Sequence, residues 1–168
     1  MNTEQAVYDA LTGMGIAYDV IEHAPAFTMD ESAWVMEPLR ATCVKNIFLC
    51  PRNQSRFYLL ITRPEAKLKT SDISKQAGAS RLAFAPEEKL WQYLREKPGA
   101  ISPMGLIFDE GREVTVLVDS ELRKMPRVAF HPCVNTASLA LSSDDFFDVF
   151  LPRLGYEPVY VTIHDFLD

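Results

Sequence analysis

Apolar residues recur at helical spacing in several segments, and residues that favour helix ends flank these segments. The clearest start signals are the capping box Thr28–Glu31 and Pro86, which precedes two glutamates. In the segment after Pro86, the spacing predicts that Leu90, Trp91 and Leu94 face inward. The predicted helices cover approximately residues 3–13, 28–36, 71–77, 87–96 and 143–154.

Alternating or continuous apolar runs between turn-forming residues predict β-strands. The predicted strands cover residues 17–22, 42–50, 57–63, 106–109, 114–119, 128–131, 137–141 and 159–163, with a hairpin turn over 51–56. Strands that cluster in hairpins, with helices interspersed irregularly, are typical of the α+β class. We therefore expect a single domain over residues 1–168, with a mixed, mostly antiparallel, curved sheet surrounded by helices.

The bulk composition is that of an ordinary globular chain. The 168 residues are 48% hydrophobic and 24% charged, which fits one domain with a sizeable core. No apolar run reaches the roughly 18–20 residues that a membrane-spanning helix needs. The polar, acidic segment Met1–Ala10 does not resemble a signal peptide. These features predict a cytoplasmic protein with no membrane contact.

The cysteines and histidines give no sign of a disulfide or a metal site. Cys43, Cys50 and Cys133 are an odd number of cysteines and show no CxxC spacing, as expected of reduced thiols. The histidines do not combine with them at the spacing of zinc ligands. We therefore expect neither a bound metal nor another cofactor.

Charge is distributed unevenly along the chain. The formal net charge is −6, yet residues 40–81 contain nine Lys and Arg against two Asp and Glu. A basic middle third on an acidic protein predicts a local surface that faces phosphate without general affinity for polyanions. The alternative is a solvated face that happens to be basic.

The segment Cys43–Cys50 is apolar like a buried strand but carries Lys45 and Asn46 at its centre. Lysine is rarely buried without a partner, because removing its charge from water is costly. We therefore expect Lys45 to face a cleft that holds an anionic or polar group. Neighbouring strand residues point to opposite faces, so both side chains line one cleft only where the strand twists or lies at an edge. Alternatively, Lys45 reaches solvent and Asn46 bonds to nearby backbone.

Two later segments also suggest a site. Gly99–Pro103 places a residue that tolerates positive φ and a residue of fixed φ around three others, which can hold backbone groups toward a ligand. Most such loops are only turns. His131 comes at the end of a predicted strand, where a histidine is either catalytic or a hydrogen-bonded structural residue. Asn135 and Ser138 either support it or cap local backbone.

The chain contains no recognisable Ser-His-Asp triad, Walker loop, GxGxxG segment or metal-binding motif. Any chemistry must therefore proceed without a strong nucleophile. An aminoacyl ester meets this condition because it hydrolyses in water unaided, and lowering its barrier by a few kcal/mol gives about a hundredfold acceleration. Positioned dipoles, a water molecule and the substrate's own ribose hydroxyl can supply this. Together the three segments suggest a site for the end of an acylated nucleotide.

Five segments, in order along almost the whole chain, closely resemble the YbaK-like editing domains associated with prolyl-tRNA synthetase. Within that family they resemble the free-standing PrdX-type (ProXp-ala) deacylases. The segments are residues 23–28, 44–49, 81–85, 98–103 and 130–136. The resemblance implies the fold of this family and removal, in trans, of alanine mischarged onto tRNA(Pro). The implied partners are the acceptor end of aminoacylated tRNA(Pro) and, transiently, prolyl-tRNA synthetase.

The resemblance also implies roles for individual residues. The family's strand lysine falls on Lys45, its Gly-x-x-x-Pro loop on Gly99–Pro103 and its histidine on His131. Catalysis in the family relies on the terminal ribose hydroxyl and the loop backbone, so no cysteine is expected to act as a nucleophile. The implied catalytic residues are Lys45, Gly99, Ser102, Pro103 and His131. The implied substrate-binding residues are Phe27, Thr28, Met29, Asn46, Ile47, Ala100, Ile101 and Asn135.

Pocket size sets the expected selectivity. A synthetase that accepts proline cannot fully exclude alanine, because a missing methylene is worth only about 1–3 kcal/mol. A second, smaller pocket corrects this, and Phe27, Met29 and Ile47 are either its walls or ordinary core residues. The competing interpretations are a relative that deacylates Cys-tRNA(Pro), and a non-catalytic tRNA or amino-acid regulator on this fold. The regulator would lack the lysine and the loop, which are both present.

Overall fold

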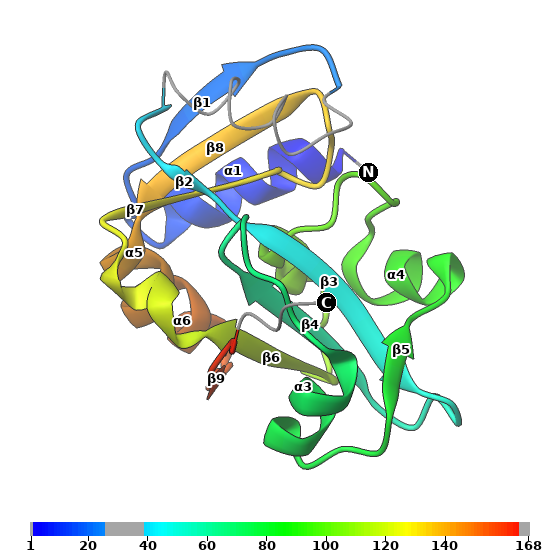
Figure 1. Ribbon diagram of the computed structural model, residues 1–168. Helices are drawn as coiled ribbons and strands as arrows, with labels where there is room; N and C mark the ends of the chain where they lie inside the picture. The colour runs from blue at the N-terminus through cyan, green and yellow to red at the C-terminus, as the bar shows by residue number, and fades with distance from the viewer. Residues whose placement is uncertain (1, 26–38, 165–168) are drawn as a thin grey trace.

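The computed structural model describes residues 2–25 and 39–164, whose strands form two sheets (Figure 1). The four-stranded sheet contains, in spatial order, β1 (Asp19–Glu22), β8 (Ala137–Ser142), β7 (Arg127–Phe130) and β2 (Thr42–Cys43). The five-stranded sheet contains β5 (Leu82–Phe84), β3 (Lys45–Pro51), β4 (Phe57–Thr62), β6 (Val114–Asp119) and β9 (Val159–Val161). The strands expected in one curved sheet are therefore divided between two.

Strand pairing is mixed within both sheets. The antiparallel pairs are β1–β8, β7–β8, β3–β4 and β3–β5, and the parallel pairs are β2–β7, β4–β6 and β6–β9. The expected hairpin is present as β3–β4, with Lys45 opposite Thr62 and Leu49 opposite Tyr58. The α+β class with mixed, mostly antiparallel pairing is therefore confirmed.

Helices cover the sheets at several points. They are α1 (Thr3–Gly13), α3 (Thr70–Ala77), α4 (Glu87–Leu94), the 3-10 helices η2 (Pro103–Phe108) and η3 (Ser120–Lys124), and the run α5 (Ser143–Asp145), π-helical η4 (Phe146–Phe150) and α6 (Leu151–Leu154). Figure 1 shows α1 behind the four-stranded sheet. Asn2 caps α1 by accepting a hydrogen bond of 3.0 Å from the Gln5 N–H. Within the residues described, no helix is long and apolar enough to cross a membrane.

The main hydrophobic core joins the two sheets. Leu139 and Phe130 of the first sheet share a cluster with Phe48 and Leu59 of the second, and Leu11 of α1 belongs to it. A second cluster lies on the opposite face of the five-stranded sheet, against α3. A third, small cluster covers the outer face of the four-stranded sheet. Each sheet therefore has apolar contacts on both faces.

The strand expected over 42–50 is interrupted at Val44, where the chain leaves one sheet and enters the other (Figure 1). Before the break, Thr42 pairs with Val128 of β7. After it, Lys45 pairs with Thr62 of β4. This crossing places Lys45 and Asn46 at the junction of the two sheets.

Two expectations about local structure are wrong. Residues 106–109 were expected as a strand, but Pro103–Phe108 is a 3-10 helix, because Pro103 occupies its first turn and the Ser102 hydroxyl caps the Met104 N–H at 3.1 Å. Trp91 was expected to face inward, but 46% of it is exposed. Leu90 and Leu94, four residues apart, form the buried stripe of α4 and leave Trp91 outside it.

Other differences concern short or irregular elements. The strand β5 and the helix η3 were not expected, and both are too short to show a clear period. The helix expected over 143–154 contains the π-helical turn η4, which ends at Phe150, two residues before Pro152 in the first turn of α6. Proline lacks a backbone donor, and a π turn is one way for a helix to accommodate that loss. The helix expected over 28–36 lies outside the described residues.

Candidate functional site

Lys45 and Asn46 begin β3 and lie on different faces of it. The Lys45 ammonium donates a hydrogen bond of 2.9 Å to the Ala66 carbonyl, on the side of the second core cluster. Ile47 is half-buried and packs against that cluster. Asn46 shares the alternate face with Phe48, which belongs to the main core. Its Oδ1 is buried and has no hydrogen-bond partner among the described residues, so the amide retains an acceptor for a ligand.

The loop after α4 carries Gly99–Pro103 and depends on a glycine. Gly99 has a φ of +90°, a conformation that side chains with a Cβ rarely adopt. A Cβ on Gly99 would meet only the Asn135 amide nitrogen, at 3.9 Å. The requirement for glycine is therefore conformational rather than steric. The same contact places Asn135, in the turn after β7, beside the loop.

Two of the four N–H groups in Gly99–Pro103, and two more at the start of η2, are already bonded. The internal donors are the N–H groups of Ala100, to the Lys97 carbonyl, Ser102, to Glu96, Met104, to the Ser102 hydroxyl, and Gly105, to the Ser102 carbonyl. Pro103 has no N–H. The N–H groups of Gly99 and Ile101 have no partner among the described residues. These two donors are the part of the loop that can bind an oxygen of a ligand.

Glu96 anchors the loop by a hydrogen bond to Ser102, and sequence reasoning did not identify it. Its side chain is buried, and one carboxyl oxygen accepts the Ser102 N–H at 2.9 Å. The other accepts the Cys133 thiol at 3.3 Å. Burial raises the pKa of Glu96 well above its ordinary value, against the opposing effect of the hydrogen bonds from Ser102, Cys133 and Gly105. Glu96 therefore joins the loop to the turn after β7.

Space for this carboxyl depends on Gly105. A Cβ on Gly105 would lie 2.6 Å from a Glu96 oxygen and 2.5 Å from the Leu94 carbonyl oxygen. An acid that follows the buried stripe of α4 does not stand out in the hydrophobic pattern, since a charged residue there is usually solvated. The nearby Gly105 is the only local signal, and it has meaning only once the two residues are seen in contact.

His131 and His23 lie together on the outer side of the four-stranded sheet. Their ring centroids are 6.1 Å apart. The His131 Nδ1–H donates to the Ala137 carbonyl at 3.0 Å, and the His23 Nδ1–H donates to the Ala24 carbonyl at 2.8 Å. In the neutral tautomer, His23 Nε2 accepts the Ser138 hydroxyl at 2.7 Å. His23 lies within a segment that resembles the family, but sequence reasoning gave it no role.

His131 is arranged as a neutral base. Burial lowers its pKa, and the neighbouring His23 lowers it further. Because Nδ1 carries the hydrogen that binds Ala137, the lone pair lies on Nε2, which has no hydrogen-bond partner among the described residues. His131 can therefore accept a hydrogen bond from a water molecule or a hydroxyl.

The cysteines are poor nucleophiles. Burial raises the pKa of Cys43 to about 11 and also raises the pKa of Cys50. The pKa of Cys133 is raised strongly, by burial and by the adjacent Glu96. The reactive form of cysteine is the thiolate, which a raised pKa disfavours. Among the residues that the structure describes, no group of three or more His, Cys, Asp and Glu is placed to hold a metal ion.

The structure brings some of the predicted site residues together. Gly99 lies beside Asn135, and both the loop and the turn contribute to one pocket, through Ala100 and Asn135. Ser102 and Pro103 are buried, Ser102 because it caps η2 and Pro103 because it starts that helix. Lys45 and Ile47 face the other side of β3. Phe27, Thr28 and Met29 lie outside the described residues.

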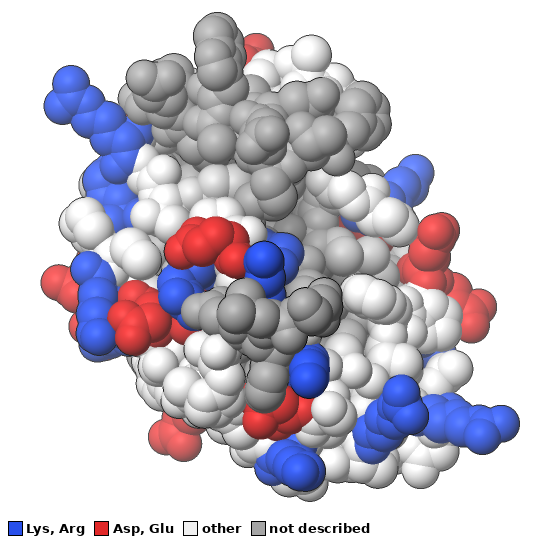
Figure 2. All heavy atoms as spheres, in the orientation of Figure 1, with Lys and Arg blue, Asp and Glu red and all other residues white. Residues whose placement is uncertain are grey.

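The basic groups do not form one continuous patch on the face shown in Figure 2. Lys and Arg there lie in several separate groups, with acidic groups between them. Arg52 and Arg56 are exposed in the turn between β3 and β4. Arg63 is instead ion-paired with the buried Asp119 at 2.7 Å. The basic charge of residues 40–81 is thus partly structural.

Solved structures share this fold. One, described as a candidate trans-editing enzyme for prolyl tRNA synthetase, matches with a TM-score of 0.73 at 17% identity over 97% of both chains. A scaffold protein used for computational epitope grafting matches with a TM-score of 0.76 at 17% identity over 99% of both chains. At these identities the similarity defines the architecture: an α+β domain of the type found in that editing-enzyme structure.

The chain belongs to the aminoacyl-tRNA editing domain family, whose model matches residues 23–149. It is 34% identical to the prolyl-tRNA editing protein ProX of Acetoanaerobium sticklandii, over 86% of this chain and 88% of that protein. It is 28% identical to prolyl-tRNA synthetase associated domain-containing protein 1 of Bos taurus, over 92% of this chain and 91% of that protein. The expected family and the expected class, an aminoacyl-tRNA deacylase, are confirmed.

Proposed function

We propose that this chain, as a single editing domain over residues 1–168, hydrolyses the ester of alanine mischarged onto tRNA(Pro), in trans and without a protein nucleophile. The observation that carries the proposal is the loop: the Gly99 and Ile101 N–H groups lack partners among the described residues while the other loop donors are bonded. The relative ProX, a prolyl-tRNA editing protein, supports tRNA(Pro) as the substrate. The proposal includes transient contact with prolyl-tRNA synthetase, which the resemblance implies.

The reaction follows from these donors. A water oxygen attacks the ester carbonyl carbon, and the Gly99 and Ile101 N–H groups stabilise the negative charge that develops on the carbonyl oxygen. The bond from that carbon to the ribose oxygen then breaks, and the ribose oxygen takes the proton that the water loses. The neighbouring ribose hydroxyl positions the water, and alanine and free tRNA leave. Protonated, buried thiols agree with a path that forms no acyl-enzyme.

His131 and Asn46 orient the substrate in this proposal. The lone pair of His131 Nε2 accepts a hydrogen bond from the terminal ribose or the attacking water. The buried Asn46 Oδ1 accepts a second one, which would satisfy an acceptor that otherwise lacks a partner among the described residues. Ile47, with Phe27, Thr28 and Met29, would limit the amino-acid pocket to the size of alanine.

Lys45 supplies the positive charge that a nucleotide needs. Its ammonium has three donors and uses one on the Ala66 carbonyl, so the remaining donors can face a phosphate. We expect Lys45→Ala to lower deacylation at least about tenfold, which corresponds to about 1.4 kcal/mol. Lys124→Ala is the matched control, because that lysine is exposed and its ion-pair partner Glu121 is also partly exposed, with their charged atoms 3.0 Å apart. Equal activity of the two variants would remove Lys45 from the site.

The decisive assay compares tRNA(Pro) charged with alanine, cysteine, serine and proline. Fastest release of alanine, with proline retained, is the expected result. Fastest release of cysteine would make this chain a Cys-tRNA(Pro) deacylase, and binding without any release would make it a regulator. A substrate with hydrogen in place of the neighbouring ribose hydroxyl should be almost inert. Full activity on that substrate would rule out the substrate-assisted path.

A further inference from the structure

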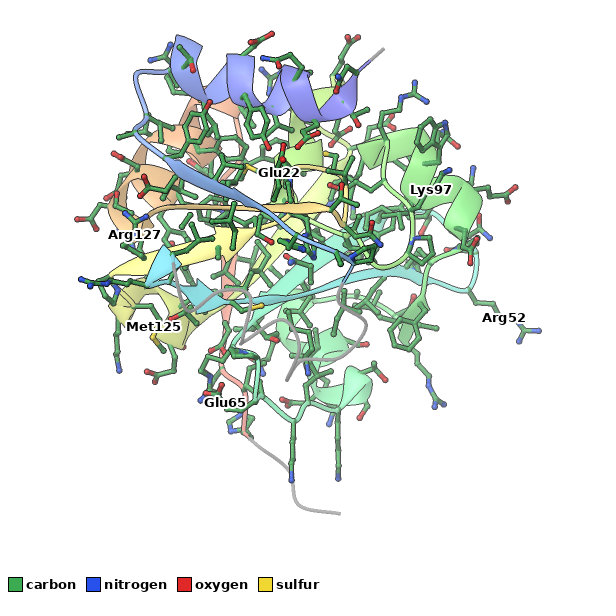
Figure 3. All side chains as sticks on the ribbon, turned by 90° about the horizontal axis from the view of Figure 1, so that it is seen from above. Glu22, Arg52, Glu65, Lys97, Met125 and Arg127 are labelled. Carbon is green, nitrogen blue, oxygen red and sulfur yellow. The ribbon has the colours of Figure 1, made fainter. Side chains whose placement is uncertain are left out.

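The end of α4 presents an exposed aromatic surface next to positive charge. Trp91 is 46% exposed although it is among the largest apolar side chains. The Arg95 guanidinium carbon lies 5.8 Å from the centroid of its ring, within the range of a cation–π contact. Lys97 is exposed two residues later. Figure 3 shows Lys97 beside α4, on the opposite side of the view from Arg127.

These side chains border a pocket of about 440 Å³. Its walls come from α4, from the loop segment 97–100, from the turn 133–136 and from Thr3 at the start of α1. Among the described residues, those that line it include Arg95 and Lys97 but no Asp or Glu, in a chain whose net charge is −6. The volume lies within the range of about 300–1,000 Å³ that is usual for small-ligand sites.

The chemistry of the pocket matches a nucleotide better than simpler ligands. An aromatic face binds a base by stacking, whichever base it is, and nearby cations bind the phosphate. The Asn135 amide adds a donor and an acceptor for a base edge. A free anion would make no favourable contact with the indole, and an apolar ligand would make none with the two cations.

The position of the pocket relates it to the candidate site. Ala100 belongs to the Gly99–Pro103 loop, and Asn135 lies in the turn that follows His131. A tRNA 3′ end that places its ester at the Gly99 and Ile101 N–H groups therefore has this pocket beside it. The exposed Trp91 is not needed for the core, since Leu90 and Leu94 form the buried stripe of α4.

We propose that this pocket binds one unpaired nucleotide of the tRNA 3′ end, with its base stacked on Trp91 and its phosphate facing Arg95 and Lys97. This inference rests on the proposed function, because it takes tRNA as the substrate. The pocket contributes to binding affinity and fixes the position of the bound strand, but it takes no part in the reaction itself. It holds the strand so that the ester reaches the loop, and it tolerates any base because stacking does not depend on the base edge.

The test measures binding of uncharged tRNA(Pro), intact or lacking its three terminal nucleotides, to the full chain. Trp91→Ala should weaken binding of intact tRNA about tenfold or more, since one stacked base is worth about 1–3 kcal/mol. The truncated tRNA should bind both proteins equally. Trp91→Phe should retain most of the affinity. Tyr160→Ala is the matched control, because Tyr160 is also 46% exposed but lies on β9.

A second arm tests the phosphate contact. Lys97→Gln should lower the salt dependence of binding by about one unit in the slope of log affinity against log salt, for intact tRNA only. With Ala-tRNA(Pro), Trp91→Ala should raise KM by a similar factor and leave kcat within a few-fold, because the indole does not touch the reacting atoms.

The outcomes separate this inference from the proposed function. If Trp91→Ala binds intact tRNA as tightly as the unchanged protein, or loses equal affinity for both tRNAs, the pocket does not hold the 3′ end. If tRNA binding is intact but capture of prolyl-tRNA synthetase is weakened, the pocket is a protein contact and the inference is wrong. If binding depends on Trp91 but no mischarged tRNA(Pro) is hydrolysed, the inference holds and the proposed function fails.

Discussion

The two sides of the candidate site differ in how their buried ionisable groups are surrounded. On the side of β3 and β4, charges are paired: Asp119 is fully buried and accepts Arg63 Nε at 2.7 Å, and the Lys45 ammonium binds the Ala66 carbonyl. On the side of the loop and the turn after β7, which we call the neutral side, burial disfavours the charged forms of Glu96 and His131, raising the pKa of the first and lowering the pKa of the second. A guanidinium beside a buried carboxyl favours its ionised form, whereas burial without a neighbouring cation favours the protonated form.

This difference fits the two ends of the proposed substrate. The phosphates of a tRNA end are charged and need cations, while the ester is neutral and reacts through a transient oxyanion. Backbone N–H groups stabilise that oxyanion best in surroundings that hold no competing negative charge. An ionised Glu96, whose carboxyl binds the Ser102 N–H, would destabilise that oxyanion by charge repulsion. The neutral side is therefore suited to the ester and the charged side to the nucleotide.

Breaking the charged side should have the largest effect on stability. Asp119→Ala removes one partner of the Arg63 side chain and also the acceptor of the Arg63 and Glu121 N–H groups, both at 3.1 Å. We expect the free energy of unfolding to fall by about 3–5 kcal/mol, the usual cost of breaking a buried ion pair by removing its carboxylate. Denaturant titration measures it.

The control for that variant is an exposed pair. Arg127→Ala breaks the bond of 2.9 Å to Asp19, whose side chain is 73% exposed. Exposed pairs are worth about 0–1 kcal/mol, so unfolding should change little. If Asp119→Ala and Arg127→Ala lowered the free energy of unfolding by similar amounts, the buried pair would contribute no more to stability than the exposed pair.

Removing the Glu96 carboxyl on the neutral side should lower the free energy of unfolding by less than Asp119→Ala does. Glu96→Ala leaves the Ser102 N–H buried without an acceptor, which costs about 1–3 kcal/mol. Glu96→Gln keeps an acceptor oxygen of nearly the same shape and should restore both stability and deacylation. Urea unfolding and single-turnover hydrolysis of Ala-tRNA(Pro) give the two readouts. If the glutamine variant is as damaged as the alanine variant, the carboxyl at this position is ionised.

Placing a residue with a Cβ at Gly99 should cost about 1–2 kcal/mol of backbone strain. Gly99→Ala has room for its methyl group, since only the Asn135 amide lies near, but it must adopt a φ of +90°. We expect deacylation to fall about tenfold as the Gly99 and Ile101 N–H groups change direction. Gly78→Ala is the control, because Gly78 also has a positive φ and open space but ends α3. Equal activity of these two variants would show that the loop geometry is not used.

The last expected effect is a difference in pH dependence. The pKa of Glu96 is raised in the folded protein, so the unfolded chain releases this proton first as pH rises. The free energy of unfolding should therefore fall with pH between the ordinary carboxyl pKa and the raised one. Glu96→Gln cannot lose a proton, so its stability relative to the unchanged protein should grow over that window. A difference that stays constant with pH above the ordinary carboxyl pKa would contradict the raised pKa of Glu96.

Much of the site was predictable because its signals are local. The β3–β4 hairpin, the helix before the loop and the Gly99–Pro103 segment follow from periodicity and from residues with restricted φ. The resemblance to the editing domains predicted Lys45, the loop and His131 as site residues by motif. The 3-10 helix over Pro103–Phe108 was missed because a short apolar run is equally compatible with a strand.

The sequence by itself determined most of the longer elements, the family and the type of residue available at each motif. Tertiary structure alone decided which loop N–H groups are left for a ligand, because Glu96 reaches Ser102 and Cys133 through space. It also decided that the strands divide into two sheets at Val44 and that Trp91 stays outside the core. Periodicity records which side of an element is apolar, whereas partners and protonation depend on contacts between segments far apart in the chain.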